Sequence, residues 1–346
     1  MGNHRGYRLT RTRTSLTVSA ISAALAMVLL IPGSGHAEPE LTLGKAQQRY
    51  DDINHQAELA TEEYNGIQEQ LRQVRERLRQ VQDRVARQQD SLAQLRNSLG
   101  KLARIQYQTG AIDGTVRLLL AEDPVAFLEQ ASLLDQLSDH QAKVLNQARS
   151  ARQEMAQAKA EANQQTAQLE SLHREVEKRK AEIEERLREA QRLLNSLRPA
   201  DRVRVIEGPA PSRSSASDRA TCQKAIARAT GRAKAAITFA CAQLGKPYRW
   251  GATGLASYDC SGLVLKAWAA AGIQLPRTSR AMYAAGRKIP LDQIIPGDSI
   301  FSYSPISHVS IYIGEDFVVT APRAGLNVRI SPMKYFKVVG ATRPGG

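Results

Sequence analysis

The chain has 346 residues, of which 42% are hydrophobic and 24% charged, and its formal net charge is +14. Such a length suggests two domains of about 150 residues each. The basic excess favours an acidic partner such as an anionic cell wall, a membrane surface or nucleic acid. The three cysteines, at positions 222, 241 and 260, match no zinc-binding spacing and argue against a metal site.

Residues 1–37 predict a secretory signal peptide. Four arginines precede an apolar run from Leu16 to Ile31, and Gly35-His36-Ala37 has the small-x-small pattern of a cleavage site. A membrane anchor is the alternative, but roughly 16 apolar residues are few for a membrane span. We therefore expect a secreted, extracytoplasmic protein, for which nucleic acid is the least suitable acidic partner.

Residues 38–198 predict a long α-helical coiled-coil hairpin. From Ile53 to Leu102, small or hydrophobic residues recur at alternating steps of three and four, and a second such pattern runs from Met155 to Ile183. Sustained heptads specify a coiled-coil seam rather than a globular core. Glycines and a proline separate the two patterns, so the helices most simply fold back antiparallel; a parallel homodimer is the competing arrangement. The three histidines of this region, His55, His140 and His173, are expected on its surface.

Residues 199–232 are rich in proline, serine, alanine and arginine, which is typical of a flexible basic linker. Residues 233–346 then read as an α+β domain. A helix ends at Gly245, a second helix runs from Cys260 to about Gly272, and five short strands follow Pro296. Cys222 and Cys241 could form a disulfide in an oxidising compartment, or Cys241 could be a buried small residue.

Cys260 is expected at the start of a helix, where the helix dipole lowers the pKa of a thiol. A small buried cysteine packed under the helix is the alternative. His308 is the sole histidine after His173, and it opens a predicted strand. The two residues can meet only if the helix packs on the sheet, and that is the layout of a papain-like thiol hydrolase, in which imidazole activates the thiolate.

Four segments of this domain together resemble the NlpC/p60 family of bacterial cell-wall cysteine peptidases. They are GKPYRWGATG, YDCSGLVLKAWAAAGIQLPRTS, IIPGDSIFSY and SHVSIYIGEDFVVTAPRAG. The resemblance implies cleavage of peptidoglycan stem peptides, usually between D-glutamate and diaminopimelate or lysine, without a metal or other cofactor. A signal peptide and coiled coil in front resemble the actinobacterial and firmicute members that act in cell division, so we expect a cell-wall-associated enzyme of wall remodelling and daughter-cell separation.

The resemblance also assigns roles to individual residues. Cys260 would be the nucleophile and His308 the base. The implied substrate-binding residues are Tyr248, Asp259, Ser261, Arg277 and Ser279. Core packing is the alternative for Tyr248 and its neighbour Trp250, and a capping or loop role is the alternative for Arg277 and Ser279.

Thr320 departs from the family pattern. The family usually presents a histidine, glutamate, glutamine or asparagine at this position, twelve residues after the catalytic histidine, to orient the imidazole. A threonine hydroxyl can accept the same hydrogen bond, but it stabilises an imidazolium less than a carboxylate does. Thr320 is therefore the candidate third catalytic residue; either the activity is reduced or another acceptor serves.

Two other functions compete with peptidoglycan hydrolysis. One is a non-catalytic or weakly active divisome regulator that acts through its coiled coil, and the other is a thiol acyltransferase, which the predicted secretion disfavours. The coiled coil is far longer than a tether requires, and the apolar segment LLLAEDPVAFL between its helices marks a docking surface. We expect the hairpin to block the Cys260 groove, in cis or across a dimer, until a partner engages it. The resemblance implies that this partner is an extracellular part of a membrane divisome complex of the ABC-transporter type.

Overall fold

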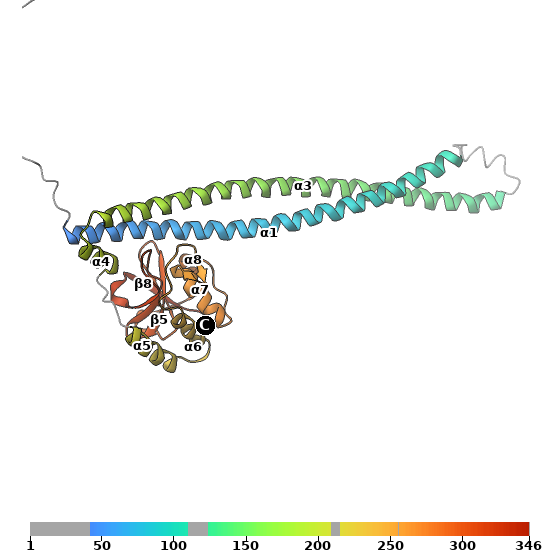
Figure 1. The fold of residues 1–346 in the computed structure, drawn as a ribbon. Helices are drawn as coiled ribbons and strands as arrows, with labels where there is room; N and C mark the ends of the chain where they lie inside the picture. Colours follow the sequence, from blue (N-terminus) through green and yellow to red (C-terminus); the bar gives the residue numbers. More distant parts are fainter. Residues whose placement is uncertain (1–41, 110–123, 209–214, 255, 346) are drawn as a thin grey trace, which may run out of the picture. The chain divides into compact units, whose positions relative to one another are not determined.

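The structure is a computed structural model that describes residues 42–109, 124–208, 215–254 and 256–345 (Figure 1). Residues 42–346 form one compact unit. The predicted signal peptide lies outside the described residues, and so does most of the apolar segment between the two long helices. None of the helices in the described ranges is both long enough and apolar enough to cross a membrane.

Two long helices lie side by side in Figure 1: α1 spans Leu43–Thr109 and α3 spans Pro124–Asn195. Their ion pairs show the direction, because Glu63 early in α1 bonds Arg179 late in α3 at 2.8 Å, whereas Arg84 further along α1 bonds Glu161 at 3.0 Å. The helices are therefore antiparallel, and the predicted hairpin is confirmed. Ile67, Leu71, Val74, Leu172 and Val176 are buried between them, as the heptad pattern requires.

The prediction of a flexible linker over residues 199–232 is wrong for most of this segment. It contains α4 (Pro199–Glu207), which begins with a proline at its first turn, and α5 (Ser215–Arg228). Val205 of α4 is buried against the base of the hairpin, while Ala225 and Ala229 are buried in the core of the C-terminal domain. Burial of these small apolar residues outweighs the polar composition from which flexibility was predicted.

The C-terminal domain is built on a six-stranded antiparallel sheet with strand order β3-β8-β4-β5-β6-β7. Its strands are β3 (Arg287–Ile289), β4 (Ser299–Ser302), β5 (His308–Gly314), β6 (Phe317–Thr320), β7 (Arg329–Pro332) and β8 (Val338–Arg343). The five predicted strands are thus confirmed, and β3 is an additional short edge strand. The remaining elements are α6 (Gly231–Ala242), β1 (Thr253–Gly254), β2 (Ser257–Tyr258), α7 (Cys260–Ala270), α8 (Ser279–Ala285) and short 3₁₀ turns at Leu291–Gln293 and Met333–Tyr335.

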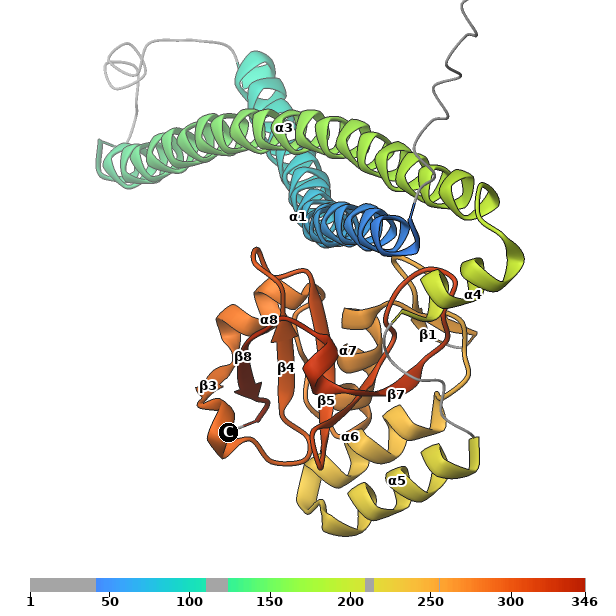
Figure 2. The ribbon, with the colours of Figure 1, turned by 90° about the vertical axis from the view of Figure 1, so that its left-hand side faces the viewer.

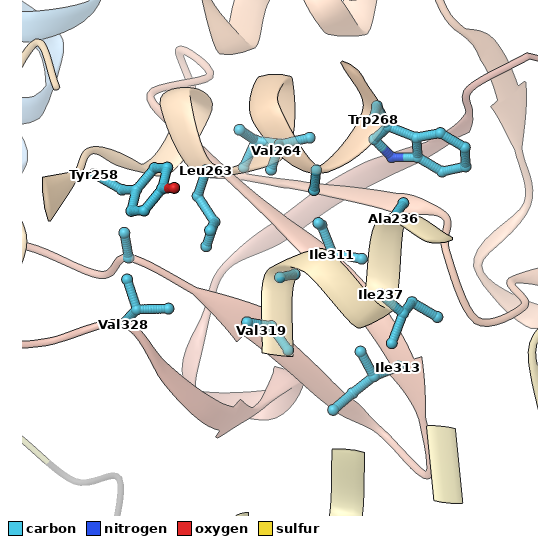
Figure 3. Packing of buried hydrophobic residues seen from close by; sticks show 14 of the residues in the cluster. Ala236, Ile237, Tyr258, Leu263, Val264, Trp268, Ile311, Ile313, Val319 and Val328 are labelled. Atoms are coloured by element: carbon cyan, nitrogen blue, oxygen red, sulfur yellow. The ribbon is translucent and has the colours of Figure 1, made fainter. Parts of the chain in front are cut away.

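Helices α5, α6 and α7 all contact β5, so the central strand is covered by helices (Figure 2). Figure 3 shows the resulting core, in which Ile237 of α6 and Leu263 of α7 lie close to Ile311 of β5. The buried members of this cluster come from residues 222–330, and none of them belongs to α1. The domain therefore has a complete core of its own, from which we expect independent folding of residues 215–346.

The start of this domain corrects the predicted boundary at residue 233. Cys222 of α5 is buried in the core and forms a disulfide with Cys241 of α6. A fragment beginning at residue 233 would lose this cross-link and the apolar face of α5. The disulfide also settles the alternative for Cys241, and Cys260 is the free cysteine of the described residues.

Candidate active site

Cys260 is the first residue of α7, as the sequence predicts. Asp259 caps the helix by accepting a 2.6 Å hydrogen bond from the backbone N–H of Gly262. A side chain at position 262 would place its Cβ 2.2 Å from the carbonyl oxygen of Ala252, so this tight entry into the helix requires glycine. The cap and the glycine together fix the position of the Cys260 side chain.

His308 is the first residue of β5, and the residue before it contacts Cys260. The Cys260 Sγ is 3.8 Å from the carbonyl oxygen of Ser307, the residue that precedes the histidine. On the far side of the ring, the Thr320 Oγ1 lies 2.8 Å from Nε2, and Phe336 stacks on the imidazole at 5.3 Å between ring centres. If Nε2 carries the proton it donates to Thr320, which leaves Nδ1 as the base; Nδ1 has no hydrogen-bond partner in the structure.

The predicted substrate-binding residues also meet here. Arg277 bonds Asp259 Oδ2 at 2.6 Å and Ser261 Oγ at 2.7 Å, so these three side chains form one polar cluster at the start of α7. Tyr248 is 9% exposed, and burial, followed by the nearby Cys260, raises the pKa of its phenol. Ser279 is buried at the start of α8. The structure thus brings all five residues to the surroundings of Cys260, with Asp259 and Arg277 bound to each other.

Helix α1 covers this site. Asn65 donates a 3.2 Å hydrogen bond to Asp259 Oδ2, and Glu62 accepts one of 2.7 Å from Ser279 Oγ. Glu58 Oε1 lies 3.8 Å from His308 Nδ1. The covering helix therefore contacts the polar cluster, the α8 start and the imidazole in succession.

These contacts were missed because sequence reasoning followed the hydrophobic seam of α1. A second stripe runs beside that seam and consists of polar residues at helical spacing, all buried: Asn54, Glu58, Thr61, Glu62 and Asn65. Such a stripe on a helix that otherwise carries exposed arginines and glutamines is the signal that could have located the contact surface. The prediction of His55 as a surface residue is wrong as well, because it is partly buried, lies 3.2 Å from Ser307 Oγ and contacts the ring of Tyr303.

Burial controls the charge of the Cys260 thiol and the His308 imidazole. It raises the pKa of the Cys260 thiol well above its usual value, and the neighbouring Asp259, Glu62 and Glu58 add to the increase. It also lowers the pKa of His308 to about 4. The helix start was expected to lower the thiol pKa, but desolvation outweighs that effect here. The covered site therefore holds a neutral thiol and a neutral imidazole, which is an unreactive state for a thiol nucleophile.

Two glutamates of α1, Glu58 and Glu62, have pKa values above that of an exposed glutamate. Burial raises the pKa of Glu58 to about 8 and that of Glu62 to about 7. At neutral pH, Glu58 is therefore largely protonated and Glu62 is protonated about half of the time while α1 covers the site. A protonated carboxyl can lie next to the neutral imidazole without a charge penalty.

Comparison with known proteins identifies relatives of this domain. Residues 245–339 match the NlpC/P60 family. A probable endopeptidase of Mycobacterium tuberculosis is 41% identical over 105 residues, which cover 30% of this chain and 27% of that protein. The peptidoglycan endopeptidase RipA of the same organism is 42% identical over 107 residues, which cover 27% of this chain and 22% of that protein. The chain thus spans about a quarter of the length of these curated relatives.

Solved structures of the same family are also similar. A crystal structure of an NlpC/P60 family protein from Bacillus cereus is 30% identical, with a TM-score of 0.32, and the match covers 34% of this chain and 41% of that one.

Proposed function

Because residues 245–339 make the C-terminal domain of this chain a member of the NlpC/P60 family, we propose that the protein is a secreted cysteine endopeptidase that hydrolyses peptidoglycan stem peptides. The bond is the one between D-glutamate and diaminopimelate, and the role is wall remodelling and daughter-cell separation. The observation that carries the proposal is the Cys260–His308–Thr320 arrangement beside the cluster of Asp259, Ser261 and Arg277. The basic charge of residues 236–346, with 12 basic and 5 acidic residues, suits an anionic wall polymer.

The reaction proceeds through an acyl-enzyme. His308 Nδ1 takes the thiol proton, and the Cys260 thiolate attacks the carbonyl carbon of the scissile amide, forming a tetrahedral oxyanion. The C–N bond then breaks as the imidazolium gives its proton to the leaving amine. Water, deprotonated by His308, hydrolyses the thioester and restores the thiol. Thr320 holds the imidazole in the tautomer that exposes Nδ1 to Cys260.

This chemistry requires α1 to leave the site. Stem peptide must reach Cys260, which is 4% exposed, and the space beside His308 is filled by Glu58. Removal of α1 admits water, which lowers the thiol pKa and raises the imidazole pKa toward their usual values. The hairpin thus keeps the enzyme inactive in cis until a partner, such as an extracellular part of a membrane divisome complex, displaces it.

Digestion of purified peptidoglycan tests the proposed reaction. Residues 215–346 should release fragments whose masses show cleavage after D-glutamate, and Cys260→Ala should release none. A chelator should leave the activity unchanged. Cleavage that survives Cys260→Ala would refute the thiol mechanism. Binding of peptidoglycan without cleavage by the wild-type fragment would favour the alternative function, a non-catalytic regulator.

A further inference from the structure

Arg323 lies three residues beyond Thr320, just after the end of β6. Its guanidinium bonds the carboxylate of Asp51 on α1 and the carbonyl oxygen of Ile206 at 3.0 Å. The guanidinium also lies 4.9 Å from the ring centre of Tyr50. Asp51 and Tyr50 belong to α1 and Ile206 to α4, so a largely buried cation of the C-terminal domain, 16% exposed, loses its carboxylate and aromatic partners whenever α1 leaves.

Arg323 lines a groove of 560 Å³. Tyr303 and Phe336, whose rings contact His308, also line this groove. Its two walls carry opposite charge. The C-terminal domain contributes the cations Arg323, Arg329 and Lys337, whereas α1 contributes the carboxyl groups of Asp51, Asp52 and Glu58. The positively charged wall of the C-terminal domain suits an anionic ligand when the acidic helix α1 is absent.

The acidic residues of α1 meet the site in sequence order. Asp51 bonds Arg323, Glu58 lies at His308, and Glu62 bonds Ser279. At 1.5 Å per residue, the steps of seven and four residues correspond to roughly 10 and 6 Å along the helix. An extended peptide advances about 3.4 Å per residue, so these carboxyl groups are spaced like acidic groups two to three residues apart on a bound peptide.

The position of Arg323 fixes which part of a substrate it can reach. His308 protonates the leaving amine, so the amine half of the stem peptide must extend past the imidazole. Thr320 contacts the Nε2 edge of the ring and Arg323 follows it by three residues, whereas Arg277 bonds Asp259 at the start of α7 and Ser279 begins α8. On the basis of the proposed function, we propose that Arg323 binds a free carboxylate on the leaving-amine half of the stem peptide, and that Asp51 occupies this carboxylate site while α1 covers the enzyme.

Arginine suits this role because its planar guanidinium can hold a carboxylate through two parallel hydrogen bonds. Diaminopimelate and a terminal D-alanine both carry such a carboxylate. The site therefore distinguishes stem peptides by the charge of their leaving half. An amidated carboxyl offers one acceptor and no charge, and it should bind less tightly.

Binding to the inactive fragment 215–346 carrying Cys260→Ala tests the proposal without relying on turnover. Calorimetry would compare two synthetic stem peptides that differ in whether the carboxyls of the leaving half are free or amidated. We expect the free-carboxylate peptide to bind on the order of tenfold more tightly. Adding Arg323→Gln should abolish that preference, because it should weaken the binding of the free-carboxylate peptide and leave the binding of the amidated peptide unchanged. Arg323→Lys should restore part of the preference.

Lys337→Gln is the matched control, because it removes one positive charge from the same groove at an exposed position. It should leave most of the preference in place. An unchanged preference in Arg323→Gln, or an equal loss in Lys337→Gln, would overturn the assignment to Arg323. Cleavage assays with intact Cys260 report separately on the proposed function: a fragment that binds with the Arg323-dependent preference but does not cleave would refute hydrolysis and leave the carboxylate site standing.

Discussion

Glu58 of α1 places a carboxyl oxygen 3.8 Å from His308 Nδ1, the ring nitrogen that accepts the proton of Cys260 in the proposed mechanism. The same helix binds Asp259 through Asn65 and Ser279 through Glu62. Helix α1, which is far from these residues in sequence, thus contacts both the imidazole of His308 and the polar side chains around Cys260. These contacts are all made within one chain, as covering in cis requires.

The covering contact should weaken as pH rises from about 6.5 to 8. Glu58 has a pKa of about 8 when covered and is expected near its usual 4.5 when open, so the open form binds fewer protons in this range and gains population with pH. The groups around Glu58 are His308, Ser307, Arg323, Glu62 and Asp51. His308 has a pKa lowered to about 4 when covered, so below pH 6.5 it binds more protons in the open form and acts in the opposite sense. The net increase of the open population with pH is therefore expected above pH 6.5.

The rate of Cys260 alkylation measures this equilibrium. The ratio of the rate in residues 38–346 to that in residues 215–346 should rise with pH, by at most about tenfold per unit for each proton that Glu58 and Glu62 release on opening. Glu58→Gln, which stays neutral, should flatten much of the rise. A ratio that falls between pH 6.5 and 8 would contradict this linkage.

The ion pair between Asp51 and Arg323 should contribute to covering. Asp51→Asn in residues 38–346 should increase Cys260 alkylation about fivefold, a modest effect because the carboxylate is 45% exposed and solvent screens the pair. Asp52→Asn is the matched control, since the neighbouring residue is exposed. Equal rates for Asp51→Asn and the unmodified chain would show that this pair does not hold α1 in place.

The sequence predicted the architecture for clear physical reasons, and it placed Cys260 at a helix start and His308 at a strand start, where the structure has them. Heptad spacing encodes the α1–α3 seam locally, and Asp259-Cys260-Ser261-Gly262 encodes a helix start. The contact of α1 with the active site depends instead on which polar residues become buried by docking, and single polar residues such as Glu58 resemble solvent-exposed heptad positions. The helices at residues 199–228 were missed for a related reason, because burial of alanines against another element is not visible in composition.

Thr320 should matter for turnover if its hydroxyl orients His308. It is fully buried with Oγ1 2.8 Å from Nε2, so Thr320→Val removes the acceptor while nearly preserving shape. We expect the kcat of residues 215–346 on a stem peptide to fall by about tenfold. Thr320→Ser keeps the hydroxyl and should retain most of the activity. A Val variant as fast as the wild type would show that the third position is not used.

The Cys222–Cys241 disulfide should stabilise the C-terminal domain. It closes a loop with a sequence separation of 19 residues, for which chain entropy predicts about 3 kcal/mol. Urea unfolding of residues 215–346 should show a loss of this order when both cysteines are replaced by serine, whereas Cys260→Ser should change stability less. An unchanged unfolding midpoint in the double variant would mean that packing of α5 suffices without the cross-link.

The rate of peptidoglycan hydrolysis by residues 38–346 relative to residues 215–346, at equal concentration and neutral pH, tests the central claim most directly. Mass spectrometry of the released stem-peptide fragments would give both initial rates, with Cys260→Ala in each protein as the blank. The covered site predicts that the shorter protein is at least about tenfold faster, because solvent and substrate reach Cys260 only when α1 is absent. Equal rates for the two proteins would contradict covering of the active site by α1.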